Sequence, residues 1–229
     1  MDNISKIISA IPLFNGLPDD QLNAIRQIAL EKQFGKGQNI FSEGDETKGF
    51  FVVVTGRVKI YKVSSEGKEQ ILHIFEAGQS FGEVTVFTDR QLPANAEALA
   101  KSRLLFFPRI AFVDLVTNNP SLALNMLAIM SKKLRQFAAQ IESLSLKEIP
   151  ARLASYLIYL ANERQTIDAV ELNISKGQLA SLLGTIPETL SRIFAKLSGQ
   201  QLIRVEGSRI ALLNRQGLED LAEYGKDLE

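Results

Sequence analysis

The side chains that most often carry catalytic or metal chemistry are scarce in this sequence of 229 residues. It contains no cysteine and a single histidine, His73. Thiol catalysis, zinc–thiolate sites, cysteine-bound iron–sulfur clusters and sites with two or three histidines from one chain are therefore excluded. Neither a phosphate-binding GxxxxGK[ST] loop nor a GxSxG nucleophile elbow occurs. We therefore expect a protein that is not an enzyme and has no metal site built from its own side chains.

Helix-start signals stand close together near the C-terminus. The segments Ser175–Gln178 and Thr185–Glu188 both fit the capping box, in which Ser or Thr is followed three residues later by Gln or Glu. Gly184 between them can take the left-handed conformation that ends a helix. Two strand-like runs follow, at 202–205 and 209–213, so the pattern predicts a winged helix-turn-helix. Its second helix is expected to bury Ile186, Leu190, Ile193, Phe194 and Leu197.

The predicted second helix carries side chains that can read DNA bases. Glu188, Ser191 and Arg192 share the face opposite its apolar residues. Arg can donate two hydrogen bonds to guanine, Glu can accept one from the amino group of cytosine, and Ser can bond a base or a phosphate. Between residues 175 and 209, five Lys and Arg oppose two Asp and Glu, although the whole chain has no net charge. Further DNA contacts are expected from Lys176, Thr189, Lys196 and Arg209.

Alternatively, Glu188 interacts within its own helix and does not contact a DNA base. Glu188 would serve as the capping-box glutamate, or would pair with Arg192 one turn away. The winged helix would then contact protein, and the chain would be a jelly-roll protein that binds a small molecule or acts as an enzyme. Metal content separates this class from a DNA-binding regulator, because a metal-binding jelly-roll enzyme needs several inward-facing histidines.

Short strand-like runs separated by glycines occupy residues 34–108, notably 39–41, 50–54, 57–63, 70–75 and 103–107. This spacing predicts a sandwich or barrel. A helical pattern follows, with apolar residues spaced 3, 4, 3, 4 and 3 apart, as in a coiled coil. We expect two copies of the chain to pair along this seam, although Leu122, Met126 and Ile129 can pack on the β-domain instead. The seam consists of Leu127, Met130, Leu134, Phe137, Ile141 and Leu144.

Motifs along most of the chain resemble the CRP/FNR family of transcription regulators. The motifs are Leu13-Phe14-x-Gly16-Leu17, a run from Gly44 to Val58, Gly78-x-x-Phe81-Gly82-Glu83, and a run from Leu179 to Arg192. The resemblance implies an α+β fold with a jelly-roll, cyclic-nucleotide-binding-like β-roll over 1–118, a dimerisation helix over 119–146 and a winged helix-turn-helix over 147–229. It also implies a homodimer, RNA polymerase as a partner, and an effector site beside Phe81, Gly82 and Glu83.

One departure from the family pattern concerns the effector. Nucleotide-binding members carry an Arg-Ser or Arg-Thr pair that holds the cyclic phosphate, whereas this chain has Leu92-Pro93-Ala94-Asn95 at that place. Proline and alanine supply neither a charge nor a side-chain donor. Arg90 is nearby but out of register. Cyclic AMP is therefore not expected, and the missing cysteines exclude an iron–sulfur cluster.

The tracts 142–147 and 152–157 resemble the haem-dependent, nitric-oxide-responsive members of the family, the regulators of dissimilatory nitrate respiration and of the hybrid-cluster protein. Haem would then lie between the β-roll and the dimer helix, with His73 as the one imidazole and Met126 or Met130 as thioether candidates. As the alternative, His73 is a hydrogen-bonded strand residue and the methionines are packing residues.

The resemblance also predicts the DNA site. Glu188, Ser191 and Arg192 match the positions with which FNR-type members read a TTGA half-site. Pro187 stands where the cyclic-AMP receptor protein has a base-reading arginine, and proline cannot donate to guanine. We therefore expect double-stranded DNA with a TTGA-like inverted repeat. No run of about 18 apolar residues and no signal peptide is found, so a cytoplasmic protein without a membrane contact is expected.

Overall fold

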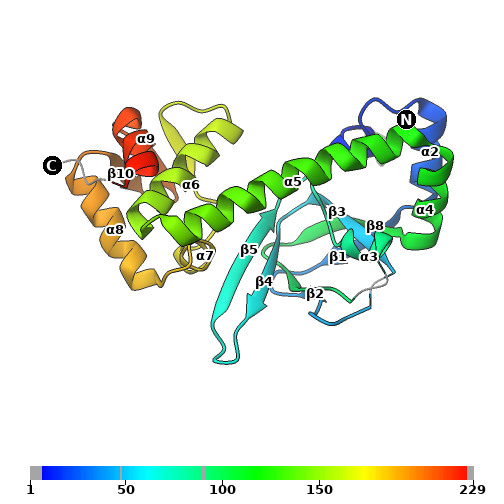
Figure 1. Cartoon of the computed structure of the whole chain (residues 1–229), viewed down its shortest axis with the longest axis horizontal. Helices are drawn as coiled ribbons and strands as arrows, with labels where there is room; N and C mark the ends of the chain where they lie inside the picture. The colour runs from blue at the N-terminus through cyan, green and yellow to red at the C-terminus, as the bar shows by residue number, and fades with distance from the viewer. Residues whose placement is uncertain (1–6, 47, 89–90, 226–229) are drawn as a thin grey trace. The chain divides into compact units, whose positions relative to one another are not determined.

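The computed structural model describes residues 7–46, 48–88 and 91–225. The chain forms two compact units, Met1–Arg135 and Gln136–Glu229. The boundary along the chain falls within a long helix, α5 (Pro120–Leu146), which Figure 1 shows in green. In the described part of the chain, no helix combines the length and apolar character needed to cross a membrane.

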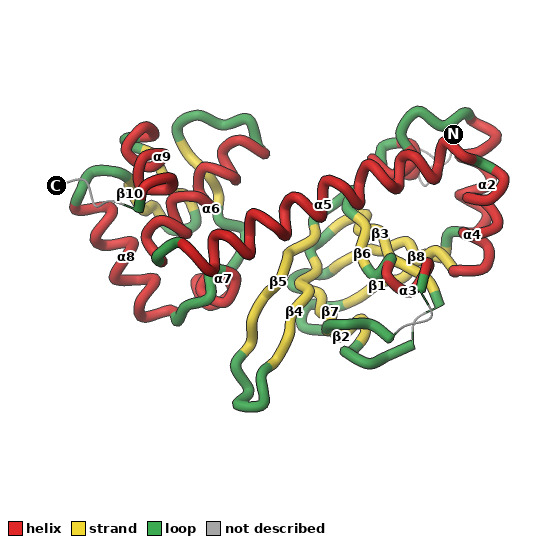
Figure 2. The backbone as a smooth tube through the Cα atoms, viewed as in Figure 1, coloured by secondary structure: helices red, strands yellow, loops and turns green. Residues whose placement is uncertain are grey.

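The N-terminal unit is built on two four-stranded sheets, and every strand pair described in them is antiparallel. This confirms the predicted β-roll, and Figure 2 shows its strands in yellow. The first sheet has the order β1 (Leu30–Phe34), β8 (Ser102–Pro108), β3 (Gly49–Thr55), β6 (Ser80–Phe81). The second has the order β2 (Asn39–Phe41), β7 (Asn95–Ala98), β4 (Val58–Val63), β5 (Glu69–Phe75). The helices of this unit are η1 (Pro12–Phe14), α2 (Asp19–Ile28), α3 (Val84–Phe87), α4 (Arg109–Asn118) and the first part of α5.

Strand β3 separates two apolar clusters and contributes to both. Phe50 and Val52 belong to the helix-side cluster, with Phe107, Phe112, Leu122 and Met126. Phe51 and Val53 point the other way, into the cluster between the sheets. A strand buried on both faces reads as a continuous apolar run rather than an alternating one. The first residue of this strand, Gly49, must lack a side chain, because a Cβ there would lie 2.2 Å from the carbonyl oxygen of Phe107.

The C-terminal unit is a winged helix-turn-helix, as predicted. It contains α6 (Ile149–Glu163), α7 (Lys176–Leu182), α8 (Pro187–Gly199) and α9 (Arg215–Tyr224). Its antiparallel sheet has the order β10 (Ile203–Glu206), β11 (Arg209–Leu212), β9 (Ala169–Glu171). One apolar cluster, which includes Leu179, Leu190 and Ile210, joins these helices to the sheet.

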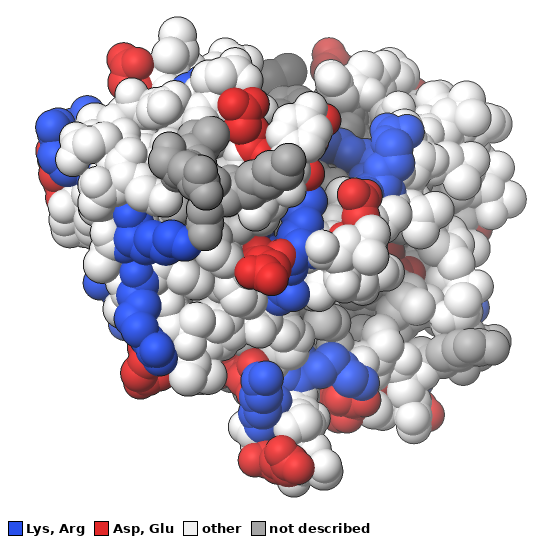
Figure 3. Space-filling view, turned by 60° about the vertical axis from the view of Figure 1, so that its left-hand side comes forward, with Lys and Arg blue, Asp and Glu red and all other residues white. Residues whose placement is uncertain are grey.

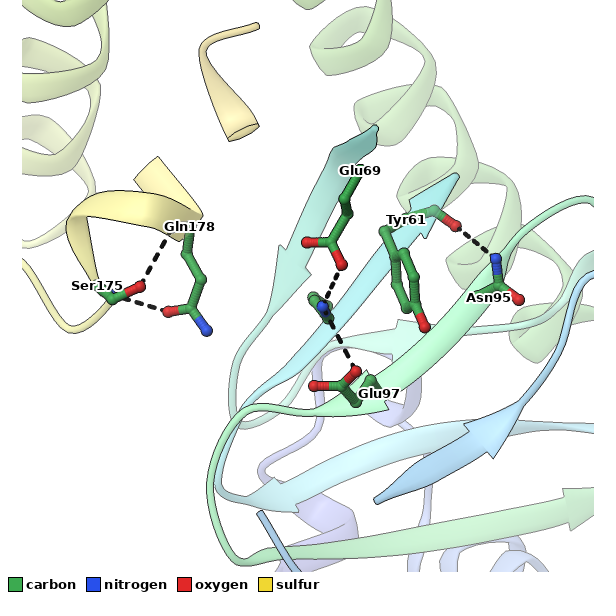
Figure 4. A network of polar contacts seen from close by, with 7 residues as sticks. Tyr61, Glu69, Asn95, Glu97, Ser175 and Gln178 are labelled. Carbon is green, nitrogen blue, oxygen red and sulfur yellow. Dashed lines mark hydrogen bonds and ion pairs between the residues drawn. The ribbon is translucent and has the colours of Figure 1, made fainter. Parts of the chain in front are cut away.

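The first predicted capping box is present and the second is not. The Ser175 hydroxyl accepts from the backbone N–H of Gln178 at 3.2 Å, and the Gln178 side chain accepts from the N–H of Ser175 at 2.9 Å (Figure 4). Helix α8 instead begins at Pro187, with Ile186 as its N-cap and no side-chain cap. Proline suits the first helical position and keeps the residue before it out of helical geometry. The prediction that Ile186 is buried was therefore wrong, since it is 51% exposed.

Candidate nucleic-acid interface and effector-sensing domain

Helix α8 presents the three predicted base-reading side chains to solvent. Glu188, Ser191 and Arg192 are exposed. The opposite face of the helix is buried in the core of the C-terminal unit through Leu190, Ile193, Phe194 and Leu197. An amphipathic helix anchored in this way holds its polar face in a fixed orientation.

The local alternatives for Glu188 are not formed. Glu188 does not cap α8, whose N-cap Ile186 has no side-chain hydrogen bond. Among the described salt bridges and hydrogen bonds, none joins the carboxylate of Glu188 to the guanidinium of Arg192. Arg204 behaves differently, because its Nε donates to Glu206 at 2.7 Å. Glu188 and Arg192 therefore do not form an ion pair with each other.

The other predicted DNA contacts also belong to the C-terminal unit. Lys176 begins α7, Lys196 lies in the last turn of α8 and Arg209 begins β11, and all three are exposed. Thr189 is half-buried on α8. Figure 3 shows Lys and Arg in several separate groups with acidic side chains beside them. On the face drawn there, the cations form no single broad basic patch.

In the N-terminal unit, the predicted effector residue Glu83 is already paired. Glu83 is 7% exposed, and its carboxylate accepts from the ammonium of Lys133 on α5 at 2.6 Å. Lys133 also donates to the carbonyl oxygen of Ser80 at 2.7 Å and lies 5.4 Å from the centre of the Phe75 ring. An ion pair that is nearly buried and has further hydrogen bonds is held firmly, because breaking it would leave a charge uncompensated.

Lys133 was not among the residues predicted for the effector site. The signal that could have revealed its role is helical spacing. Lys133 follows Leu122, Met126 and Ile129 on the inward face of α5, and a cation on a buried face needs a partner.

Four phenylalanine rings pack together in the cluster between the two sheets. Phe81 lies 5.4 Å from Phe51, 6.0 Å from Phe41 and 5.5 Å from Phe75, measured between ring centroids. Leu92 is 2% exposed and packs in the same cluster. The segment that departs from the family pattern thus adds a hydrocarbon side chain to this interior. Gly82 follows Phe81 with φ of +81°, a conformation that glycine adopts without strain, and Arg90 lies outside the described residues.

A second lysine with little solvent exposure, Lys59 on β4, forms ion pairs with carboxylates of the same sheet. The ammonium of Lys59 lies 2.5 Å from Glu69, 3.5 Å from Glu97 and 4.2 Å from the ring centre of Tyr61 (Figure 4). Burial raises the pKa of the Tyr61 hydroxyl, with the neighbouring Lys59 acting in the opposite direction. These groups satisfy one another across β4, β5 and β7, so we assign them to the stability of the sheet.

His73 lies on β5 and is neutral near pH 7. Its ring centre is 4.6 Å from that of Phe75. Burial, reinforced by the charge of Lys133, lowers the pKa of His73 from 6.5 to about 4. A neutral imidazole fits the requirement for an iron ligand.

The two candidate methionines pack in the helix-side cluster. Met126 is buried in the helix-side cluster and Met130 packs against it, whereas His73 contacts Phe75 of the cluster between the sheets. No group of three or more His, Asp or Glu in the described part of the chain could hold a metal ion.

The depressed pKa of His73 predicts a pH dependence of stability. Between pH 6.5 and pH 4 the unfolded chain binds a proton that the folded chain excludes, so stability present above pH 6.5 is lost as the pH falls. We expect about 2 kcal/mol less stability at pH 4.5 than at pH 7 from this group. Urea unfolding of the wild type and of His73→Gln at both pH values measures it, because the variant lacks this contribution. Equal pH dependence in the two proteins would contradict the prediction.

Helix α5 exposes a row of large apolar side chains. Leu127, Leu134 and Ile141 are 63%, 71% and 66% exposed, and Phe137 is also exposed. Two members of the predicted seam differ, because Met130 packs against the helix-side cluster and Leu144 is half-buried. Leu122 and Met126 are buried and Ile129 is partly buried against the β-domain, as the alternative had it. The exposed row with heptad spacing is Leu124, Leu127, Ser131, Leu134, Ala138 and Ile141.

Two family models match the chain. Residues 31–119 match the cyclic nucleotide-binding domain, and residues 151–221 match the Crp-like helix-turn-helix domain. The chain is 30% identical over 214 residues to a probable transcriptional regulator, flp, of Lacticaseibacillus casei, which covers 93% of this chain and 97% of that protein. It is 30% identical over 212 residues to the fumarate and nitrate reduction regulatory protein of Vibrio cholerae, covering 91% of this chain and 84% of that protein.

A solved structure has the same architecture. The structure of FixK2 from Bradyrhizobium japonicum superposes with a TM-score of 0.76 at 25% identity and covers 85% of this chain and 97% of that one. Relatives that span almost the whole chain are transcription regulators, so the alternative of an enzymatic jelly roll was wrong. With the β-roll, the long helix and the winged helix-turn-helix in the expected order, the chain belongs to the CRP/FNR family of DNA-binding transcription regulators.

Proposed function

We propose that the chain acts as a homodimer that binds an inverted repeat of TTGA-like half-sites through α8. The supporting observation is the exposed face of Glu188, Ser191 and Arg192, whose charges are not paired with each other. Residues 1–118 would sense an effector, 119–146 would dimerise and 147–229 would bind DNA. Regulators of this family are dimeric and contact RNA polymerase, so we propose the polymerase as a second partner.

The proposed specificity follows from donor and acceptor chemistry. Arg192 would donate to O6 and N7 of the guanine, and Glu188 would accept from the amino group of the paired cytosine. Pro187 has no donor to select an additional guanine. Two-fold symmetry would place the half-site centres about one helical turn apart, near 34 Å.

Selection of binding sites from random DNA tests this proposal. The expected product is a palindrome with TTGA-like arms. A non-palindromic consensus, or the absence of any enrichment, would overturn it. A gel assay at two salt concentrations then separates base reading from phosphate attraction, since the latter weakens steeply with salt.

We further propose that the effector is not cyclic AMP. The place of the phosphate-binding pair contributes buried Leu92 and Ala94, and the carboxylate of Glu83 already accepts from Lys133. A cyclic phosphate would enter this interior without a guanidinium to balance its charge, which is costly. The match to a cyclic nucleotide-binding domain concerns the fold, which regulators with other effectors can share.

The finer proposal names haem with nitric oxide as the effector. It rests on the tracts 142–147 and 152–157 and on the neutral imidazole of His73. We expect micromolar cyclic AMP to leave operator affinity unchanged. We expect haem added to the reduced protein to give an absorption spectrum that shifts with nitric oxide and changes in His73→Ala.

These two effector proposals fail independently. Operator binding driven by micromolar cyclic AMP in a calorimetric titration would refute the first. A haem spectrum identical to that of free haem, with and without nitric oxide, would refute the second. A protein-bound haem spectrum that is unchanged in His73→Ala would remove His73 as the ligand.

A further inference from the structure

Arg152 donates to the backbone at three places in the C-terminal unit. It lies in the first turn of α6, and its Nε donates to the carbonyl oxygen of Lys147 at 2.8 Å. Its Nη2 donates to the carbonyl oxygen of Leu144 at 2.8 Å, and its Nη1 to that of Leu183 at 3.0 Å. Leu144 belongs to the last turn of α5, Lys147 follows the end of α5, and Leu183 is the C-cap of α7. One guanidinium therefore connects the ends of two helices to a third.

These acceptors are the groups that helix ends leave unsatisfied. The last carbonyls of a helix have no partner in the helix, and a cation near them is also favoured by the helix dipole. A guanidinium is planar and always charged, and its donors are held in a fixed fork. Lysine has one flexible nitrogen and cannot reproduce three bonds in these directions.

The surroundings hold Arg152 in place. The neighbouring Ala151, Leu153 and Ala154 on α6 are buried, so the backbone that carries the guanidinium is anchored in the core. A second polar link joins the same segments, because the ammonium of Lys147 lies 3.2 Å from the hydroxyl of Ser155. Movement of the end of α5 relative to α6 would break both links.

We propose that Arg152 is a positioning residue that sets α8 relative to the end of α5, an inference that rests on the proposed function. The carbonyl of Leu183 lies just before the turn through Gly184 to Ile186, which leads into α8. By tying this turn to the end of the dimer helix, Arg152 fixes where each recognition helix starts. In the dimer it therefore controls how sharply the protein discriminates the spacing of two half-sites.

The test compares DNA sites that differ only in half-site spacing. Operator affinity is measured for the selected spacing and for spacings one base pair longer and shorter, with Arg152→Gln and Arg152→Lys beside the wild type. Both variants should bind the selected spacing about tenfold more weakly, on the scale typical of coupling between sites. Their preference for that spacing over the shifted ones should fall by a similar factor. The dimerisation constant and the affinity for random DNA should stay within about twofold of the wild type, which is much smaller than the tenfold loss expected on the operator.

Arg164→Gln is the matched control. Arg164 also donates to a backbone carbonyl in this unit, that of Glu171 at 2.6 Å, and the bond touches neither α5 nor α7. Its loss should leave the spacing preference unchanged. An unchanged spacing preference in folded Arg152→Gln would overturn the inference, as would equal weakening on all DNA together with a lowered melting temperature. A wild-type protein that prefers no paired half-sites would instead defeat the proposed function, and this inference with it.

Discussion

The substitution Leu134→Glu is expected to convert the dimer to a monomer and to weaken operator binding at least about a hundredfold. Leu134 is 71% exposed near the middle of the apolar row on α5. Burying a leucine side chain contributes about 1.5–3 kcal/mol, and a two-fold interface loses that contribution from both copies. The two new carboxylates would also repel each other across the symmetry axis.

Sedimentation and DNA titration measure the two consequences. The control is Ala139→Glu, which adds the same charge at an exposed position on α5. Five residues further along the helix, its side chain points about 140° away from that of Leu134. The control should remain dimeric and bind DNA as the wild type does. An intact Leu134→Glu dimer would show that this row is not the interface.

The substitution Arg192→Ala is expected to weaken operator binding by about 1–3 kcal/mol, or roughly tenfold to a hundredfold. Arg192 is exposed on α8 and can donate two hydrogen bonds to one guanine. Loss of both bonds removes discrimination at that base pair and leaves the other positions unchanged. Affinity for operators carrying each of the four bases at this position measures the effect.

Lys196→Ala provides the contrast. Lys196 lies in the last turn of α8, where a phosphate contact is expected. Its loss should weaken all sequences alike and reduce the dependence of binding on salt. If the guanine preference survives in Arg192→Ala, α8 does not read DNA in the way proposed here.

Much of the fold could be predicted from the sequence because its signals are local. A capping box such as Ser175–Gln178 joins residues three apart, and a heptad row repeats within one helix. The five strand-like runs before residue 108 correspond to strands in the structure, since their β-branched and aromatic residues suit a half-buried pleated surface. The order of these signals was sufficient to predict a sandwich or barrel, a long helix and a winged helix-turn-helix, and the family resemblance added that the sandwich or barrel is a β-roll.

Three strands gave no usable local signal. Strand β1 (Leu30–Phe34) is mostly exposed and polar, β6 (Ser80–Phe81) has two residues, and β7 (Asn95–Ala98) consists of small and polar residues. Each is a strand because a neighbour pairs with it, β8 for the first, β3 for the second and β2 and β4 for the third. Pairing between distant segments depends on tertiary contacts and is weakly encoded in any one segment.

The sequence by itself determined which metal and thiol sites this chain cannot build and which helix face carries the residues proposed to read DNA, because both depend on residue types and helical spacing. Only the tertiary structure decided the partners of the buried charges. Lys133 meets Glu83 from 50 residues away, and Arg152 reaches Leu183 across 31. The tertiary structure also decided that Met130 packs against the β-domain, because one side of α5 covers the core of that domain. These contacts depend on which apolar surfaces pack together. The spacing of apolar residues along a single helix shows which face is buried but not which surface buries it.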